Sequence, residues 1–411
     1  MKKIIAITAV MAFFGSVASA ELLKNFKYDG SIEVNAYNTS NTFDYNKKAD
    51  DKTGNVDSRV MINASFDLNN DASAFVSVVK NNRKYGDASE DANTIQSSLF
   101  FEQAYLNLKG VFGMDHKLGR QYYGKSGDLV VYFGPLMWPY DNGMIVNAID
   151  GWTGWYKTGN WDIHAILATE VNSVAAPTNK DVRLSGINAS TKIDRWNLNA
   201  YYYNENDKSS GKSNYLGVLG ARANWECMFV KGLNLGLEYD MNMGKDTTVA
   251  VDNEHQGYAY KVNADYSMDI MGKLGLEAEY LFASGDEKPT DKKDEEYTSI
   301  NGDYRPGIIN GGGFNTYATG SGSVIYGLGA NWTPEKLNKL NVAAKYYDFS
   351  ADKKVALTKK HEGAELDLVA TWNHSENVSV KGYYAMFTPE KKNNTNDDAA
   401  TMLGAAFNVK F

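Results

Sequence analysis

The sequence is dominated by segments in which apolar and polar side chains alternate with a period of two residues. Each segment is about 9 to 14 residues long, the length that a tilted β-strand needs to cross a membrane. Such alternation also occurs in half-buried sheets of soluble proteins, so the connections must distinguish the two cases. Residues 232–240 are the clearest example, with Leu233, Leu235, Leu237 and Tyr239 on one face and Asn234, Gly236, Glu238 and Asp240 on the other.

The linkers between these segments alternate between short and long. We count about 18 candidate strands, an even number, as in bacterial outer-membrane barrels, whose short periplasmic turns and longer extracellular loops alternate in this way. The sequence therefore predicts an all-β fold, a transmembrane antiparallel β-barrel, as a single domain over residues 21–411. The first strand would run outward from the periplasm. The long linkers lie near residues 39–55, 124–147, 244–255, 285–320, 351–362 and 389–398.

The positions of the aromatic residues support the same topology. Tryptophan and tyrosine collect at the two membrane–water interfaces. In the predicted barrel, tryptophans fall at the periplasmic strand ends and tyrosines at the opposite ends, which gives two aromatic girdles. The tryptophans are Trp161, Trp196, Trp225, Trp332 and Trp372, and the tyrosines are Tyr202, Tyr239, Tyr258, Tyr280, Tyr346 and Tyr384.

Both ends of the chain carry features of an exported outer-membrane protein. Residues 1–20 have a positive start, an apolar run and the small residues Ala18-Ser19-Ala20, which together predict a signal peptide cleaved after Ala20. The alternating last strand ends on the aromatic Phe411. We expect this residue to be recognised by the barrel assembly machinery. The mature chain would then lie in the bacterial outer membrane, in contact with its lipids and lipopolysaccharide.

Composition and motifs argue against several other functions. The formal net charge of −8 disfavours nucleic acid as a partner. Cys227 is the single cysteine, so the chain has no disulfide framework. The five histidines are scattered, and neither a nucleophile elbow nor a phosphate-binding glycine loop is present. We therefore expect no enzyme, no cofactor and no metal site, with an outer-membrane hydrolase or adhesin as the distant alternative.

Three stretches resemble the alginate-export family of outer-membrane porins. They are Leu118-Gly119-Arg120-Gln121, Ile149-Asp150-Gly151, and the closing region with residues 363–368, 377–380 and 383–389. The resemblance implies a monomeric 18-stranded barrel that transports solutes or a polyuronate across the outer membrane.

Charged residues on the predicted inner face bear on what the pore passes. A pore for a polyanion should be lined with Arg and Lys, whereas here the inward carboxylates outnumber the inward cations. Glu365 and Asp367, facing the strand of Lys381, would form either a selectivity constriction or wall-bracing ion pairs. The candidate pore-lining residues are Arg59, Arg120, Asp150, Arg222, Glu238, Lys261, Asp265, Glu277, Glu279, Lys345, Glu365, Asp367 and Lys381.

Two long linkers differ in character. The 124–147 linker is unusually apolar, so it would either fold into or over the barrel and narrow it, or pack against neighbouring loops outside. Its candidate constriction residues are Tyr132, Phe133, Met137 and Trp138. The 285–320 linker is rich in carboxylates. It is interpreted as a solvated charge run rather than a divalent-cation site, because no ligand spacing supports such a site.

These features favour a porin that lets small hydrophilic solutes diffuse passively, with a mild preference for cations. The alternative within transport is export or uptake of a specific polysaccharide of the alginate type.

Overall fold

The computed structural model describes residues 24–42, 45–49, 52–84, 99–135, 148–171, 181–208, 212–248, 252–288, 290–312, 321–355, 357–391, 393 and 396–411. The proposed signal peptide, Met137 and Trp138 lie outside these residues. Within them no helix is long and apolar enough to cross a membrane.

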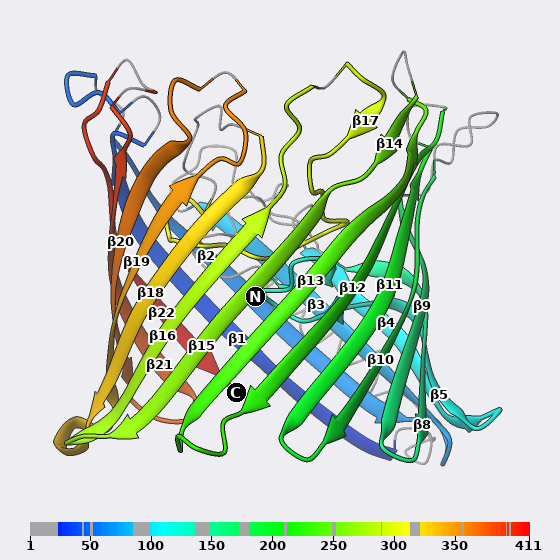
Figure 1. Ribbon diagram of the computed structural model, residues 1–411. Coiled ribbons are helices and arrows are strands. Elements are labelled where there is room, and N and C mark those ends of the chain that lie inside the picture. Colours follow the sequence, from blue (N-terminus) through cyan, green and yellow to red (C-terminus); the bar gives the residue numbers. More distant parts are fainter. Residues whose placement is uncertain are drawn as a thin grey trace.

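The described chain forms a closed antiparallel β-barrel (Figure 1). Its main sheet has 20 strands. Two of these, β14 (Asn253–His255) and β17 (Lys293–Asp294), are short ribbons between loops, and the remaining 18 build the wall. The last wall strand pairs with the first, from Ser31–Lys410 to Ser40–Thr401, and so closes the ring. The fold class predicted from the alternation is confirmed.

The wall strands run in chain order around the ring. They are β1 (Lys24–Ser40), β2 (Thr53–Asp67), β3 (Ala72–Lys84), β4 (Leu99–Val111), β5 (Met114–Gln121), β8 (Ile149–Thr158), β9 (Trp161–Val171), β10 (Val182–Ile193), β11 (Trp196–Asp207), β12 (Asn214–Glu226), β13 (Leu233–Asp246), β15 (Tyr258–Asp269), β16 (Gly272–Ala283), β18 (Ser323–Pro334), β19 (Leu340–Ser350), β20 (His361–Asn373), β21 (Val378–Pro389) and β22 (Ala400–Lys410).

Short turns and long loops lie at opposite ends of the barrel. The lower end in Figure 1 carries tight connections such as the one between β8 and β9, whereas the upper end carries the long loops. The short 3-10 helix η1 (Glu335–Leu337) joins β18 to β19 at the lower end. The lower end is therefore the periplasmic end of an outer-membrane barrel and the upper end the extracellular one.

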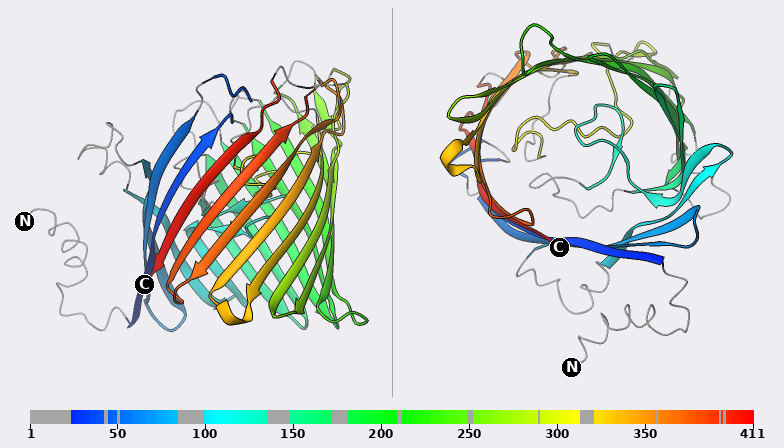
Figure 2. Two further views of the ribbon diagram at one scale, coloured as in Figure 1. Left: turned by 90° about the vertical axis from the view of Figure 1, so that its left-hand side faces the viewer. Right: turned by 90° about the horizontal axis from the view of Figure 1, so that it is seen from below.

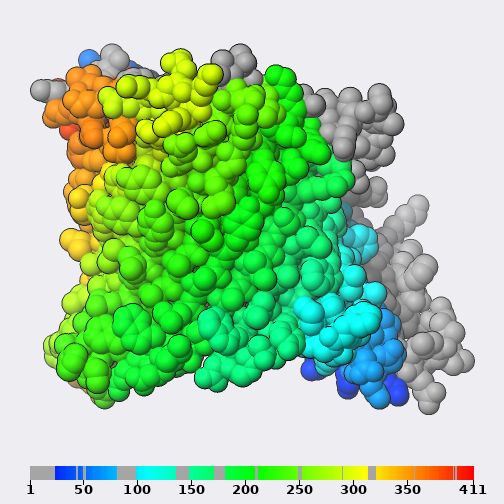
Figure 3. Space-filling view, turned by 45° about the vertical axis from the view of Figure 1, so that its right-hand side comes forward, coloured from blue at the N-terminus to red at the C-terminus, as the bar shows by residue number. Residues whose placement is uncertain are grey.

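Side chains alternate across the wall as the sequence pattern requires. On β13 the outward Leu235 and Leu237 are 37% and 54% exposed, because they face the space that lipid would fill. Glu238, the residue after Leu237, faces the lumen, where it binds Arg222. Trp196 and Trp225 pair across β11 and β12 at the periplasmic end, with stacked rings 5.7 Å apart. The outer wall over these strands is the face in Figure 3.

Inward tyrosines lie flat on the wall above glycines of the neighbouring strand. The ring of Tyr203 covers Gly186, and the ring of Tyr201 covers Gly220, so that a Cβ at either glycine would collide with the ring. These glycines leave room for large inner-face side chains on which other segments then pack.

At the seam, the backbone of Phe411 exchanges two hydrogen bonds with Gly30. Its role as an assembly signal stays a prediction.

We predict that Gly186→Val destabilises the barrel by about 1–3 kcal/mol, the usual cost of overpacking, because Tyr203 must leave its position. The control is Gly382→Val on β21, since an added Cβ there meets nothing within 4 Å. Urea unfolding followed by tryptophan fluorescence measures both variants. Equal stability of the two would contradict this role for Gly186.

Candidate functional site: a lumen crossed by two loops

The segment after β5 turns into the barrel instead of continuing the wall. It contains the short strands β6 (Tyr123–Gly124) and β7 (Tyr132–Phe133), and it runs inside the ring in the view from below (Figure 2). Val130 and Val131 are fully or almost fully buried, as is Phe133. Of the two placements considered for the 124–147 linker, the described part adopts the inward one, because its apolar side chains pack on inner-face residues such as Ile166 and Leu184. We call residues 122–135 the first loop.

A second segment, residues 296–312, also enters the lumen, and we call it the second loop. Ile308 and Ile309 are buried there. The interpretation of the whole 285–320 linker as a solvated charge run is therefore wrong for this part. Its sequence explains why, since the carboxylates are concentrated before residue 297 whereas Ile308 and Ile309 follow.

The two loops bind each other inside the barrel. The amide of Tyr132 donates to the carbonyl of Asn301 at 2.7 Å, and the amide of Asn301 donates to the carbonyl of Val130 at 2.9 Å. The carboxylate of Asp303 accepts hydrogen bonds from the hydroxyl of Ser126 and the amide of Gly127. Because these bonds satisfy backbone groups that would otherwise be buried unpaired, the loops form one unit across the lumen.

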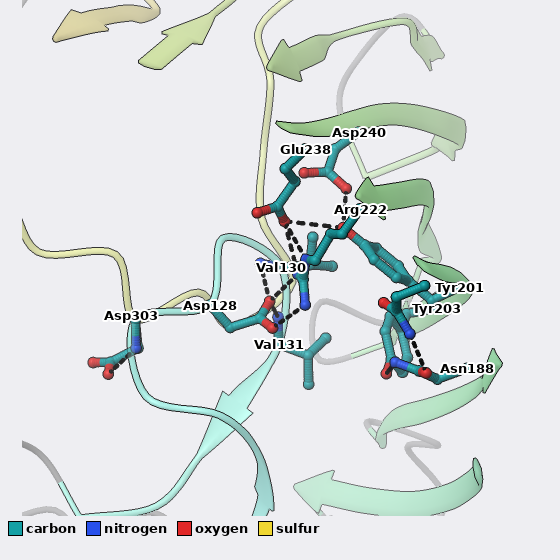
Figure 4. Close-up of polar contacts among 12 residues, drawn as sticks. Asp128, Val130, Val131, Asn188, Tyr201, Tyr203, Arg222, Glu238, Asp240 and Asp303 are labelled. Atoms are coloured by element: carbon teal, nitrogen blue, oxygen red, sulfur yellow. Dashed lines mark hydrogen bonds and ion pairs between the residues drawn. The ribbon is translucent and has the colours of Figure 1, made fainter. Parts of the chain in front are cut away.

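One anchor of this unit is an ion pair to the wall (Figure 4). Arg222 on β12 faces Glu238 on β13 in the strand register. Its guanidinium binds Glu238 at 2.7 Å and reaches Asp128 of the first loop at 2.7 Å. Asp128 in turn accepts hydrogen bonds from the amides of Val130 and Val131. Arg222 therefore holds the loop through the residue that shapes its turn.

Tyr201 completes this anchor from the next strand. Its hydroxyl lies 2.6 Å from a carboxylate oxygen of Asp240 and 3.0 Å from one of Glu238. The Arg222 guanidinium lies over the Tyr201 ring, 4.5 Å from its centroid, where a cation–π contact adds to the ion pairs. Removing one partner from such a buried network costs about 3–5 kcal/mol, because the other charge stays behind unpaired.

The second anchor is on another part of the wall, on β20. Glu365 is completely buried and accepts hydrogen bonds from the amides of Ile309 and Asn310 at 2.6 and 2.9 Å. Asp367 accepts one from the amide of Ile308 at 3.1 Å. These carboxylates lie on the inner face of β20, where they hold the backbone of the second loop. Neither meets Lys381, whose register partner on β20 is Thr371.

Further wall contacts fix the second loop between these anchors. Tyr304 donates to Glu279 on β16 at 3.0 Å, and Lys261 lies 4.2 Å from the Tyr304 ring centroid. Burial raises the pKa of Tyr304 and of Tyr297 well above the usual tyrosine value, and it raises the pKa of Tyr132 to about 12. These phenols stay neutral at physiological pH, so they add hydrogen bonds but no charge to the loops.

One open space lies between the first loop and the wall of β1, β2, β21 and β22. This cavity of about 350 Å³ is lined by Glu33, Arg59, Lys381 and Tyr132, among others. Arg59 is 7% exposed and binds Glu33 at 2.6 Å. Lys381 has no ion-pair or hydrogen-bond partner among the described residues, so its charge faces the cavity uncompensated. We call this space the side passage.

A second hollow of about 230 Å³ lies on the wall of β15, β16, β18 and β19. Lys261 pairs with Glu279 at 3.1 Å, and Lys345 pairs with Glu277. Asp265 lies opposite Glu277 in the strand register. These five predicted residues do share the inner face, and most of their charge is compensated by mutual pairing.

The prediction that Arg120 and Asp150 line the pore is wrong. They form an ion pair at 2.8 Å, but on the outer face. Arg120 shares its side of β5 with Leu118, which is 40% exposed, and Asp150 shares its side of β8 with Trp152. The inner face at this height belongs to Gln121 and Thr153, which bind each other. The alternation near Gly119 is too short to fix the parity from sequence.

Several residues of the site were not predicted, among them Asp128, Asn301, Asp303 and Tyr304. They lie in loops, where no periodicity marks which way a side chain points. The wall does carry a signal for an inserted loop. Ile166 and Leu184 are apolar at inward positions, which indicates that an apolar segment packs on them in the lumen. Within the described residues, no group of three His, Cys, Asp or Glu is placed to hold a metal ion.

A family model described as Gram-negative porin matches residues 6–392. No curated protein matches the chain in sequence. Among solved structures, OpdQ of Pseudomonas aeruginosa is similar with a TM-score of 0.62 at 11% identity, covering 96% of this chain and 99% of that one. OprD of Pseudomonas aeruginosa is similar with a TM-score of 0.60 at 10% identity, covering 95% of this chain and 94% of that one. OccAB1 of Acinetobacter baumannii is similar with a TM-score of 0.60 at 11% identity, covering 95% of this chain and 97% of that one. At these identities the likeness shows the fold alone.

The resemblance to the alginate-export family is contradicted by this match to a different porin family. The stretches that carried it are pieces of barrel wall. Leu118–Gln121 lies in β5, residues 149–151 open β8, and residues 363–368 lie in β20. Any such wall needs alternating side chains, and it needs glycines where strands make close contacts. These stretches therefore indicate a barrel fold and say nothing of the transported substrate.

We predict that Arg222→Ala loosens the first loop, since Asp128 and Glu238 lose their shared cation. Single-channel recordings should show larger and noisier currents than the parent protein. The control is Lys157→Ala, which removes an exposed ion pair with Asp162 far from the loops. Indistinguishable currents for Arg222→Ala and the parent would show that this ion pair does not hold the loop.

We also predict that the double variant Glu365→Ala, Asp367→Ala frees the second loop and raises conductance. Both carboxylates bind loop amides, so a higher current is the main expected effect, ahead of any change in ion preference. Glu365→Gln, Asp367→Asn keeps acceptor oxygens for the amides and should stay near the parent conductance. An altered ion preference at unchanged conductance would instead support the selectivity role first expected for this pair.

Proposed function

Because this chain belongs to the Gram-negative porin family, we propose that it is an outer-membrane channel through which small hydrophilic solutes diffuse passively. The observation that carries the proposal is the division of the lumen. The two anchored loops cross the lumen, and we take the side passage along β1, β2, β21 and β22 as the route for solutes.

The lining of the side passage suits small polar solutes. It presents the Arg59–Glu33 pair, the uncompensated Lys381 and the polar side chains of Ser126, Ser379 and Asn408. Such groups can replace part of the hydration of a solute as it passes. A cavity of about 350 Å³ suits single small molecules better than a folded or branched polymer.

The ion preference should follow from the balance of charges along the whole route. Carboxylates outnumber cations on the inner face, which supports the mild cation preference expected from the sequence. Lys381 opposes it locally, because it places an unpaired positive charge on the lining of the side passage. Interactions with ions in the wide mouths are screened over about 8 Å at physiological salt, so the charge at the side passage should have the larger influence.

The proposal is tested with the purified full chain in planar bilayers and in proteoliposomes. We expect stable ohmic conductance, and liposome swelling with monosaccharides that decreases steeply for larger sugars. A protein that reconstitutes in its folded form without conducting would contradict the proposal, as would swelling that does not depend on solute size.

We predict that Lys381→Glu strengthens cation preference, because it reverses the one uncompensated charge of the side passage. The reversal potential in a KCl gradient measures the change. Lys157→Glu, on an exposed position near the periplasmic turn of β8, provides the matched charge reversal and should leave the reversal potential near the parent value. Equal shifts for the two variants would show that ions do not pass close to Lys381.

A further inference from the structure

On three adjacent strands the outer face changes from apolar to polar before the extracellular rim. On β9 the outward Leu167, 58% exposed, is followed by Thr169. On β10 the outward Ile187, 51% exposed, is preceded by Ser185 and Arg183. On β11, Tyr202 is followed by Asn204 and Asn206, which align in register with Ser185 and Arg183. By contrast, β16 keeps Tyr280 and Phe282 on this face up to its extracellular end.

The polar positions surround a hollow of about 430 Å³. The outward polar side chains that line it are Asp150, Thr169, Arg183, Ser185, Asn204 and Asn206, and the outward Leu167 borders it as well. The side chains of Thr169, Ser185 and Asn206 have no hydrogen-bond partner among the described residues, and the side-chain oxygen of Asn206 is buried without one. A polar group that is withdrawn from water without a partner is costly, so the hollow has unused capacity for a polar ligand.

Two ion pairs supply charge at its edges. Arg183 binds Asp181 at 2.7 Å, yet its side chain is 67% exposed, so most of its five N–H donors remain available. Asp150 binds Arg120 at 2.8 Å and is 62% exposed, so it keeps free acceptor positions. The hollow therefore offers a guanidinium at one edge, a carboxylate at another, and hydroxyl and amide groups between them.

The position of the hollow indicates what meets it. Leu167, Ile187 and Tyr202 lie directly on its periplasmic side, and they face the hydrocarbon and its boundary. Groups one step further toward the outside lie at the level of lipid headgroups, because tyrosine girdles mark that boundary. This face of the barrel is brought forward in Figure 3.

We propose that this hollow binds the headgroup of a phosphorylated glycolipid of the outer leaflet. Arg183 binds a phosphate, as guanidinium groups do through paired N–H donors. Asp150 accepts hydrogen bonds from sugar hydroxyls, and Thr169, Ser185 and Asn206 bind the remaining ones. The acyl chains lie on Leu167, Ile187 and Tyr202. A glycolipid fits better than a phospholipid, since several separate hydroxyl and amide partners match a sugar ring rather than one small ethanolamine group.

The test uses the full-length protein, delipidated in detergent, with diphosphoryl lipid A as the probe. Native mass spectrometry counts bound lipid, and a titration gives the affinity. We expect Arg183→Ala to weaken binding by about tenfold or more, the loss expected for one charged hydrogen-bonding partner. Ser185→Ala should weaken it less. The control Lys245→Ala removes the cation of another exposed ion pair, with Asp252, at the extracellular end of β13, and should bind as the parent does.

Heat-modifiable electrophoretic mobility confirms that each variant is folded. Arg183→Lys keeps the charge and should retain part of the affinity even if Arg183→Ala folds poorly. Parent-like lipid A binding by both folded Arg183→Ala and Ser185→Ala would overturn the proposal. Equal or tighter binding of phosphatidylethanolamine at the same residues would overturn the assignment to a glycolipid.

Discussion

The closed hydrogen-bond ladder between β1 and β22 is the constraint on which the remaining structure depends. In a bilayer each unpaired backbone amide or carbonyl costs several kcal/mol, so a sheet can span the membrane only without free edges. Closure by 18 strands fixes an inner and an outer face for every residue of the wall. It also encloses a lumen too wide for wall side chains to fill, and the loops must determine what passes.

The loops enter because the inner face is not uniformly polar. Buried Ile166, Leu184 and Val218 offer apolar surface inside the barrel, on which Val130 and Val131 can pack away from water. Apolar packing alone does not fix the orientation of the loops, whereas the charged anchors do. Arg222 fixes the first loop on one wall, Glu365 fixes the second loop on another, and the Tyr132–Asn301 backbone bonds join them. The side passage is a part of the lumen beside this unit, lined by the first loop and by β1, β2, β21 and β22.

The wall could be predicted from sequence to a large extent, whereas the site could be predicted only in part. A strand between lipid and water must alternate with a period of two. The sequence therefore predicts that Leu237 faces the lipid and that Glu238 faces the lumen. Arg120 and Asp150 were misassigned because a few residues beside Gly119 do not establish parity. Glu365 and Asp367 lie on the inner face, where the period of two puts them, but their partners are backbone amides of a loop distant in sequence. The alternation within a segment does not predict a contact between a wall carboxylate and a distant loop. The ion pair between Asp128 and Arg222 could not be predicted for the same reason.

The most direct test of this account is thiol labelling at the side passage during single-channel recording. Lys381→Cys is made in a protein whose one native cysteine is replaced by Cys227→Ala, and a bulky methanethiosulfonate reagent is added. The account predicts that the open-channel current falls sharply on labelling, while the cysteine-free parent is unaffected. Complete labelling at position 381 with an unchanged current would show that ions cross the lumen elsewhere, and would contradict the side passage as the conducting route.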